Sequence, residues 1–121
     1  MRKLILRLSV SIDGFIEGAA GQKLDFGKSR SPEGAALVAE KMGHGGAHLL
    51  GRKSFCQMAS FWPTASGTAA EHMNTIPKIV FSRKGFDPAE VTDAAGWANA
   101  QVITDDLTTA LAVLKQQPGK D

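Results

Sequence analysis

Two short apolar runs in this sequence are each followed at once by basic and hydroxyl residues. His48-Leu49-Leu50 leads into Gly51-Arg52-Lys53-Ser54, and Ile79-Val80-Phe81 leads into Ser82-Arg83. If both runs are strands of an open α/β sheet, their carboxyl ends lie at the edge where such sheets bind ligands. Arginine can place two charge-assisted hydrogen bonds on a phosphate, and glycine lets a ligand approach the backbone. The pattern predicts an anion-binding crevice that contains Arg52, Lys53 and Arg83, with Gly51 and Ser54 beside them.

Two other interpretations of these residues have to be weighed. Each cation alone is simply explained as a solvated charge at a strand end, and only the three together favour a crevice. A phosphate loop of the G-x-x-x-x-G-K-S type is excluded, because Arg52 precedes the lysine and because the residues between Gly46 and Gly51 are apolar. Kinase or NTPase activity is therefore not expected.

Composition excludes several classes of protein. The net charge of +2 is spread along the chain with no basic run longer than two residues, so no nucleic-acid partner is expected. No eighteen apolar residues run together, and the apolar stretch before Arg7 is too short for a signal peptide. We therefore expect no membrane association and a cytoplasmic location. Cys56 is the only cysteine, and no histidine has another histidine or a cysteine at the spacing typical of metal ligands. We therefore expect no structural metal.

Local patterns predict the elements that must position the cations. Alternating apolar residues over 4–12 predict a first strand, which ends at the turn pair Asp13-Gly14. Ser31-Pro32 is typical of a helix start and predicts a helix over 32–42. A buried strand over 47–50 and a helix that buries Phe55 follow, and then a short helix over 68–74, begun by a capping box of Thr68 and Glu71.

The second half of the chain continues the alternation of strands and helices. Strands are predicted over 78–82 and 101–104, and Asp105 or Asp106 can cap a last helix that ends before Pro118. Alternating elements favour an α/β fold with a largely parallel sheet and helices on both faces. At 121 residues, the chain is expected to be a single domain.

The motifs, in their order, resemble the dihydrofolate-reductase-like family, which includes bacterial dihydrofolate reductase and the C-terminal reductase domain of riboflavin-biosynthesis proteins. The resemblance rests on Ser11-Ile12-Asp13-Gly14-Phe15-Ile16, Gly51-Arg52-Lys53-Ser54, Ile76-Pro77 and Phe81-Ser82-Arg83. It implies a three-layer α/β/α fold with a mostly parallel mixed sheet. In the family a strand ending in Gly-Gly follows the helix that corresponds to 108–117. We therefore expect residues 1–121 to form a domain truncated at its C-terminal end, or one whose sheet a partner chain completes.

The resemblance also implies a cofactor and residues that bind it. NADPH would be bound through Gly51, Arg52, Lys53 and Ser54 at its phosphates, through Ser82 and Arg83 beside the adenosine 2′-phosphate, and through Thr104 near the adenine. Reduction of a C=N bond also needs a proton source, which dihydrofolate reductases supply from a carboxylate. Asp25 and Glu33 are the candidates for this catalytic role. Each also has an ordinary explanation, Asp25 as a loop carboxylate and Glu33 as a residue that compensates a helix dipole.

Two hypotheses about function follow. In the first, the chain is an NADPH-dependent reductase of a small heterocycle, such as a dihydrofolate-like pterin or a riboflavin-pathway pyrimidine. In the second, it is a non-catalytic or assembly-dependent remnant of the fold that binds nucleotide or phosphate weakly. Exposed strand edges favour association in both cases, and we expect a homodimer.

Overall fold

A parallel sheet of three short strands organises the protein. The computed structural model describes residues 1–22 and 30–121. Its helices and strands are, in chain order, α1 (Pro32–Gly43), β1 (His48–Gly51), α2 (Arg52–Ala59), α3 (Thr68–Thr75), β2 (Lys78–Phe81), β3 (Gln101–Ile103) and α4 (Leu107–Gln116). The strand order is β1-β2-β3, with His48 opposite Lys78 and Ile79 opposite Gln101. The predicted α/β class and the last three predicted strands are confirmed.

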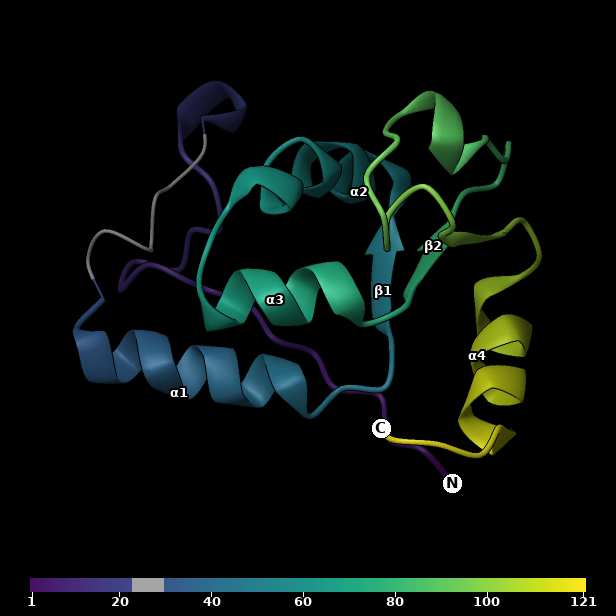
Figure 1. Cartoon of the computed structure of the whole chain (residues 1–121), viewed down its shortest axis with the longest axis horizontal. Helices are drawn as coiled ribbons and strands as arrows, with labels where there is room; N and C mark the ends of the chain where they lie inside the picture. Colours follow the sequence, from purple (N-terminus) through teal and green to yellow (C-terminus); the bar gives the residue numbers. More distant parts are fainter. Residues whose placement is uncertain (23–29) are drawn as a thin grey trace.

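Helices lie on both sides of this sheet. Figure 1 shows α1, α2 and α3 on one side and α4 on the other. Val80 is fully buried and packs with Phe55 and Trp97 on the side of α2 and α3. Ile79 points the opposite way, because successive side chains of a strand alternate, and it lies beside α4. The sheet is therefore the middle layer of three.

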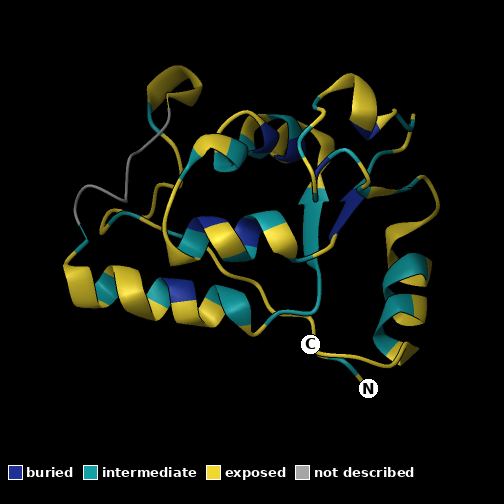
Figure 2. Cartoon of the chain, in the orientation of Figure 1, coloured by how far each residue is buried: buried dark blue, intermediate teal, exposed yellow. Residues whose placement is uncertain are grey.

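The core is small and lies on one face of the sheet. It consists of Phe55, Ala59, Met73, Val80 and Trp97, and Figure 2 shows buried residues gathered on α2, α3 and β2. The indole Nε1 of Trp97 donates a hydrogen bond of 2.7 Å to Asn74, whose amide in turn donates to the carbonyl of Trp62. Because the Trp97 ring is buried and its indole nitrogen has a hydrogen-bond partner, it anchors the loop before β3 to α3.

Most helix starts follow the sequence signals. The Ser31 hydroxyl accepts a hydrogen bond of 3.1 Å from the Gly34 amide at the start of α1. A carboxylate oxygen of Asp106 accepts one of 2.9 Å from Thr109 at the start of α4. The predicted capping box of Thr68 and Glu71 is wrong. Gly67, with a φ of 100°, precedes α3 and makes Thr68 the first helical residue, so its hydroxyl makes no cap.

The predicted first strand over 4–12 is also wrong. This segment makes no strand pairing, and most of its side chains are exposed, from 49% at Val10 to 110% at Ile12. A strand needs a neighbour for its amides and carbonyls, and no strand lies within hydrogen-bonding distance of this segment in the described part of the chain. The residues just before it contact the C-terminal region, where the Arg2 amide donates to the Lys115 carbonyl and the Lys3 amide to the side chain of Asp121. The predicted turn is confirmed by the Gly14 amide, which donates to the Ser11 carbonyl.

Candidate functional site

Four polar side chains surround a depression at the carboxyl ends of β1 and β2. Arg52, Ser82, Arg83 and Lys84 line it, and its volume is about 530 Å³. Gly51 and Phe81 are opposite each other in the sheet register, so the residues that follow them emerge side by side. The parallel pairing therefore brings together Arg52 and Arg83, two of the three cations predicted for one crevice, with Ser82, which the family resemblance placed beside Arg83.

A tight turn holds the β2 side of the crevice. The Gly85 amide donates to the Ser82 carbonyl at 3.0 Å, and Gly85 has a φ of 66°, which favours glycine. The Ser82 amide donates to the carbonyl of Ile103 at the end of β3. Arg83 and Lys84 are the two central residues of this turn, and both side chains are exposed. The turn thus presents two adjacent cations to solvent at the crevice.

The β1 side of the crevice is the start of α2. Gly51 precedes the helix and supplies no side-chain cap, so no side chain caps the first amides of α2. A Cβ atom added to Gly51 would meet nothing within 4 Å, which leaves space for a ligand beside the backbone. The positive end of the helix dipole and the charge of Arg52 both attract an anion.

Arg52 is held in place by an aromatic ring. Its guanidinium lies 5.1 Å from the centroid of Phe86, which packs at 5.6 Å against the fully buried ring of Phe55. An arginine over a ring face is attracted to the π electrons. The rings of Phe55 and Phe86 therefore connect the core to Arg52, the side chain that would contact a phosphate.

The charge of the crevice is positive and uncompensated. Among the residues that the structure describes, no carboxylate forms an ion pair with Arg52, Arg83 or Lys84, and no acidic residue lines the depression. Like charges this close repel one another, and a bound anion relieves the repulsion. The donor set of two guanidinium groups, one ammonium group and one hydroxyl fits a phosphate group.

Other residues predicted for the site lie around the crevice or away from it. Lys53 and Ser54 are exposed in the first turn of α2 but do not line the depression. Thr104 follows β3, and its methyl group would lie 3.4 Å from a Cβ atom added to Gly85, so it borders the turn. Asp25 lies outside the described residues. Sequence reasoning missed Lys84 and Phe86, although the pair Arg83-Lys84 before a glycine was a usable signal for the first.

Glu33 lies in the first turn of α1, on a different element from the crevice. Hydrogen bonds from its own backbone amide and from the Ser31 hydroxyl lower the pKa of its carboxyl. A lowered pKa keeps the carboxylate ionised at neutral pH, where it compensates the helix dipole. Its catalytic role stays a prediction.

The described residues offer no other kind of site. They contain no group of three or more histidine, cysteine or acidic residues that could hold a metal ion. Within the same residues, no helix is both long and apolar enough to cross a membrane.

Comparison with known proteins identifies the family. A search of curated proteins found no match to the chain. The family model for the RibD C-terminal domain matches residues 2–121, which is nearly the whole sequence. That family is dihydrofolate-reductase-like and points to a reductase of the riboflavin-pathway type. The chain, with its parallel sheet and its cationic crevice at the strand ends, belongs to the RibD C-terminal domain family.

Proposed function

We propose that the chain is an NADPH-dependent reductase of a small heterocycle, either a riboflavin-pathway pyrimidine or a dihydrofolate-like pterin. The observation that supports this most is the uncompensated crevice of Arg52, Ser82, Arg83 and Lys84. NADPH differs from NADH by one phosphate on the adenosine ribose, so a protein that selects NADPH needs donors for that phosphate. The crevice offers such donors at the carboxyl edge of a parallel sheet, where α/β folds bind nucleotides.

In this proposal the residues of the chain bind and orient the cofactor. Arg52 and Arg83 hold the 2′-phosphate from two sides, and Ser82 donates its hydroxyl. The open backbone at Gly51 and the first amides of α2, with Lys53 and Ser54, meet the other phosphates, and Thr104 borders the adenine. When bound, NADPH supplies the hydride. Asp25 and Glu33 are the two candidates for the proton donor.

The strength of these contacts sets the expected selectivity. A hydrogen bond to a charged group contributes about 1.5–3 kcal/mol. Since about 1.4 kcal/mol is a tenfold change in affinity, loss of one such contact weakens NADPH binding by about tenfold to a hundredfold. NADH lacks the phosphate, so its affinity should change little. The ratio of the two dissociation constants therefore reports on the crevice.

The test is a titration of NADPH and NADH against wild type, Arg52→Ala and Arg83→Ala. We expect both variants to lose affinity for NADPH and to keep their affinity for NADH, so that the two dissociation constants become similar. Lys120→Ala removes an exposed cation that does not line the depression and serves as the matched control. Equal binding of the two cofactors by wild type, or wild-type selectivity in Arg52→Ala, would refute the proposal.

One observation favours the second function, an assembly-dependent domain that binds nucleotide weakly. β1 has a strand partner on one side only in the described residues, and its other edge is open. Such an edge pairs readily with another chain, and a homodimer is one way to cover it. Native mass spectrometry with an activity assay separates the two functions. A monomer that reduces substrate supports the first, whereas activity confined to an assembled species supports the second.

A further inference from the structure

Three basic side chains meet where β1 and β2 begin, at the end of the sheet opposite the crevice. His48 is the first residue of β1 and Lys78 the first of β2, and the two lie opposite each other in the register. Their side chains therefore point to the same face of the sheet, the one that α3 covers. His72 of α3 lies beside His48, close enough for a hydrogen bond through its backbone. We call His48, His72 and Lys78 the basic junction.

Two polar atoms of the basic junction are enclosed without a hydrogen-bond partner. In the described structure these atoms are Nε2 of His48 and Nζ of Lys78. Lys78 is 2% exposed, and its Nζ lies 4.6 Å from the centroid of Trp97. Enclosing one charge is costly, and a second like charge beside it adds repulsion. The packed junction therefore holds one charge, that of Lys78 over the Trp97 ring, and favours a neutral His48.

Acidic residues on the elements packed against the basic junction do not compensate it. Those of α3 and of the second half of α1 are Glu71 and Glu40, and both are exposed. Glu40 lies 4.0 Å from His44 instead. In the loop before β3, Asp93 is exposed as well. A proton on His48 would thus meet the charge of Lys78 with no carboxylate from these elements between them.

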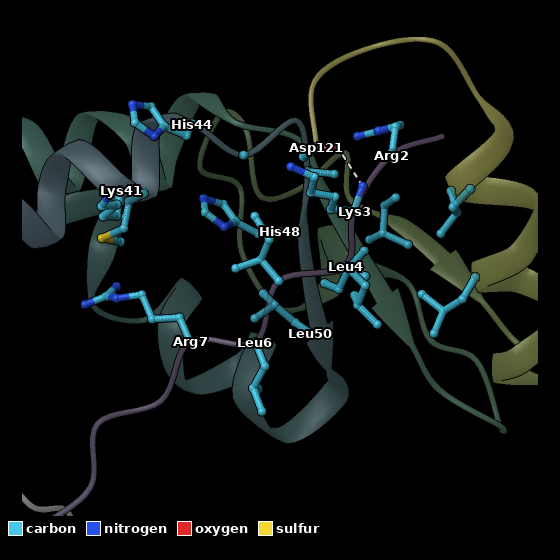
Figure 3. A pocket seen from close by; sticks show the side chains of 18 of the residues that line it. Arg2, Lys3, Leu4, Leu6, Arg7, Lys41, His44, His48, Leu50 and Asp121 are labelled. Atoms are coloured by element: carbon cyan, nitrogen blue, oxygen red, sulfur yellow. Dashed lines mark hydrogen bonds between the residues drawn. The ribbon is translucent and has the colours of Figure 1, made fainter.

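The remaining neighbours of His48 are mostly cationic. The charged and titratable residues that line the same cavity as His48 are Arg2, Lys3, Arg7, Lys41, His44, Lys115 and Asp121. The carboxylate of Asp121 accepts a hydrogen bond of 2.7 Å from the Lys3 amide. Figure 3 shows this contact on the side of Arg2, away from Lys41. These residues therefore add to the positive surroundings of His48.

The surroundings of His48 determine how its protonation affects stability. Burial, and then the nearby charge of Lys78, lower the pKa of His48, and a hydrogen bond to the His72 backbone opposes this only in part. Because the folded pKa is below the unfolded one, the unfolded chain binds more protons between the two values. The contribution to stability is complete above the usual histidine pKa of about 6.5, and it is lost as the pH falls toward the folded value.

The end of α1 is the part of the junction that can open most easily. The His72 imidazole lies against Gly43, the last residue of α1, and a Cβ atom added there would be 2.7 Å from its Nε2. Gly45 and Gly46 then make the connection to β1 pliable. Within α1 itself, Ala39 is the one buried residue. With so few buried contacts, opening here needs little free energy and lets water reach His48.

We propose that the basic junction is an acid-sensitive latch. When His48 takes up a proton beside Lys78, the end of α1 separates from α3 and the start of β1 opens to water. At neutral pH the uncharged imidazole keeps the latch closed. The latch uses none of the crevice residues, so this inference does not depend on NADPH binding.

A titration of the imidazole resonances by NMR tests the coupling between His48 and Lys78. In wild type we expect a His48 midpoint below about 6.5, the usual value for histidine. Lys78→Met removes the like charge and should raise that midpoint by at least about 0.5 pH unit. Lys41→Met is the matched control, because Lys41 is an exposed lysine at the end of α1 whose charge water screens. It should leave the midpoint unchanged.

Urea unfolding at pH 7.5 and pH 5 measures the effect of the latch on stability. From the higher to the lower pH, the folding equilibrium constant of wild type should fall at least about three times more than that of His48→Gln, which takes up no proton there. His44→Gln changes an exposed histidine and should behave as wild type. The amide of residue 48 donates to the Pro77 carbonyl at 2.8 Å. Its protection against hydrogen exchange should fall more in wild type than in His48→Gln.

Each other outcome overturns the proposal. A wild-type His48 midpoint at or above 6.5 would show that the junction accepts the second charge, and this result stands even if Lys78→Met does not fold. Equal midpoints in wild type and in a folded Lys78→Met would show that the two groups do not act on each other. An equal acid loss of stability in wild type and His48→Gln would assign the sensitivity to another group. Unchanged protection at residue 48 would show that the start of β1 does not open.

Discussion

Arg52 and Phe86 show how one residue can prepare another for a ligand. The guanidinium already lies over the Phe86 ring, 5.1 Å from its centroid, so little side-chain freedom remains to be lost when an anion binds. Phe86→Leu keeps apolar volume and removes the ring. Since an exposed cation–π contact contributes about 0.5–1 kcal/mol, we expect affinity for 2′,5′-ADP to fall about two- to fivefold by calorimetry.

The matched control for that experiment is Phe61→Leu. Phe61 packs edge-on against Trp62 at 5.1 Å, and neither residue lines the crevice. Its change should leave the affinity for 2′,5′-ADP as in wild type. Equal losses in both variants would mean that the Phe86 ring acts through general stability and not through Arg52.

Lys78 is the least expected residue in the molecule. It is 2% exposed, its Nζ has no hydrogen-bond partner in the described structure, and it lies 4.6 Å from the centroid of Trp97. Burial lowers the pKa of this lysine to about 8. A lysine before an apolar run gives no sign in the sequence that it will be buried.

Because Lys78 is buried, the stability of the protein should change with pH in the alkaline range. The folded pKa of about 8 is below the unfolded value of 10.5, so the unfolded chain binds more protons between these values and stability rises with pH across that window. A shift of one pKa unit corresponds to about 1.4 kcal/mol. The free energy of unfolding should therefore rise by an amount of the order of 2 kcal/mol between pH 7 and pH 10. In urea unfolding at pH 7 and pH 10, Lys78→Met should be more stable than wild type at pH 7 and lack this gain. Parallel pH profiles of the two proteins would contradict it.

Among the connections between elements, the loop before β3 depends on one glycine. Gly96 has a φ of 79°, and a Cβ atom added to it would lie 2.0 Å from the carbonyl oxygen of Asn74 in α3. Gly96→Ala therefore combines left-handed strain, about 1–2 kcal/mol, with a collision against backbone. We expect a loss of at least about 2 kcal/mol of unfolding free energy in urea and a weaker near-ultraviolet signal from Trp97.

Gly34→Ala is the same substitution in a permissive place. Gly34 lies inside α1, and its added Cβ atom would meet Ser31 at 3.5 Å, an ordinary contact. Alanine in a helix interior is favoured over glycine by about 1 kcal/mol, so this variant should match or exceed wild type. If both substitutions cost the same, the close approach of Gly96 to α3 is not what fixes the loop.

Elements with local signals could be predicted from the sequence, and elements that depend on a distant neighbour could not. Ser31-Pro32 starts α1 and Asp106 caps α4 through contacts within four residues. The alternation over 4–12 is a genuine strand pattern, yet strand formation needs a second chain segment alongside. The crevice could be predicted because parallel strands end at one edge. Lys84 and Phe86 were not predicted for the site, because their positions depend on the turn at Gly85 and on packing against Phe55.

Taken as a whole, the molecule has one well-packed side and one sparsely packed side. The cluster of Phe55, Met73, Val80 and Trp97 lies between the sheet and helices α2 and α3, whereas no residue of α4 is fully buried. A cavity of about 590 Å³ separates β1 from residues 2–7, and both Met58 and Met73 on one side and Leu111 and Leu114 on the other line it. Segments with few buried apolar contacts open locally at low free energy.

Native-state hydrogen exchange should therefore divide the chain in two. We expect the amides of β2 and the second half of α3 to exchange slowest, because the buried core covers them. Amides of 4–12 and of α4 should exchange at least about a hundredfold faster, which corresponds to a local opening that is cheaper by about 2.7 kcal/mol. If Leu6 and Leu8 were as protected as Val80, the N-terminal segment would already be a strand of the sheet.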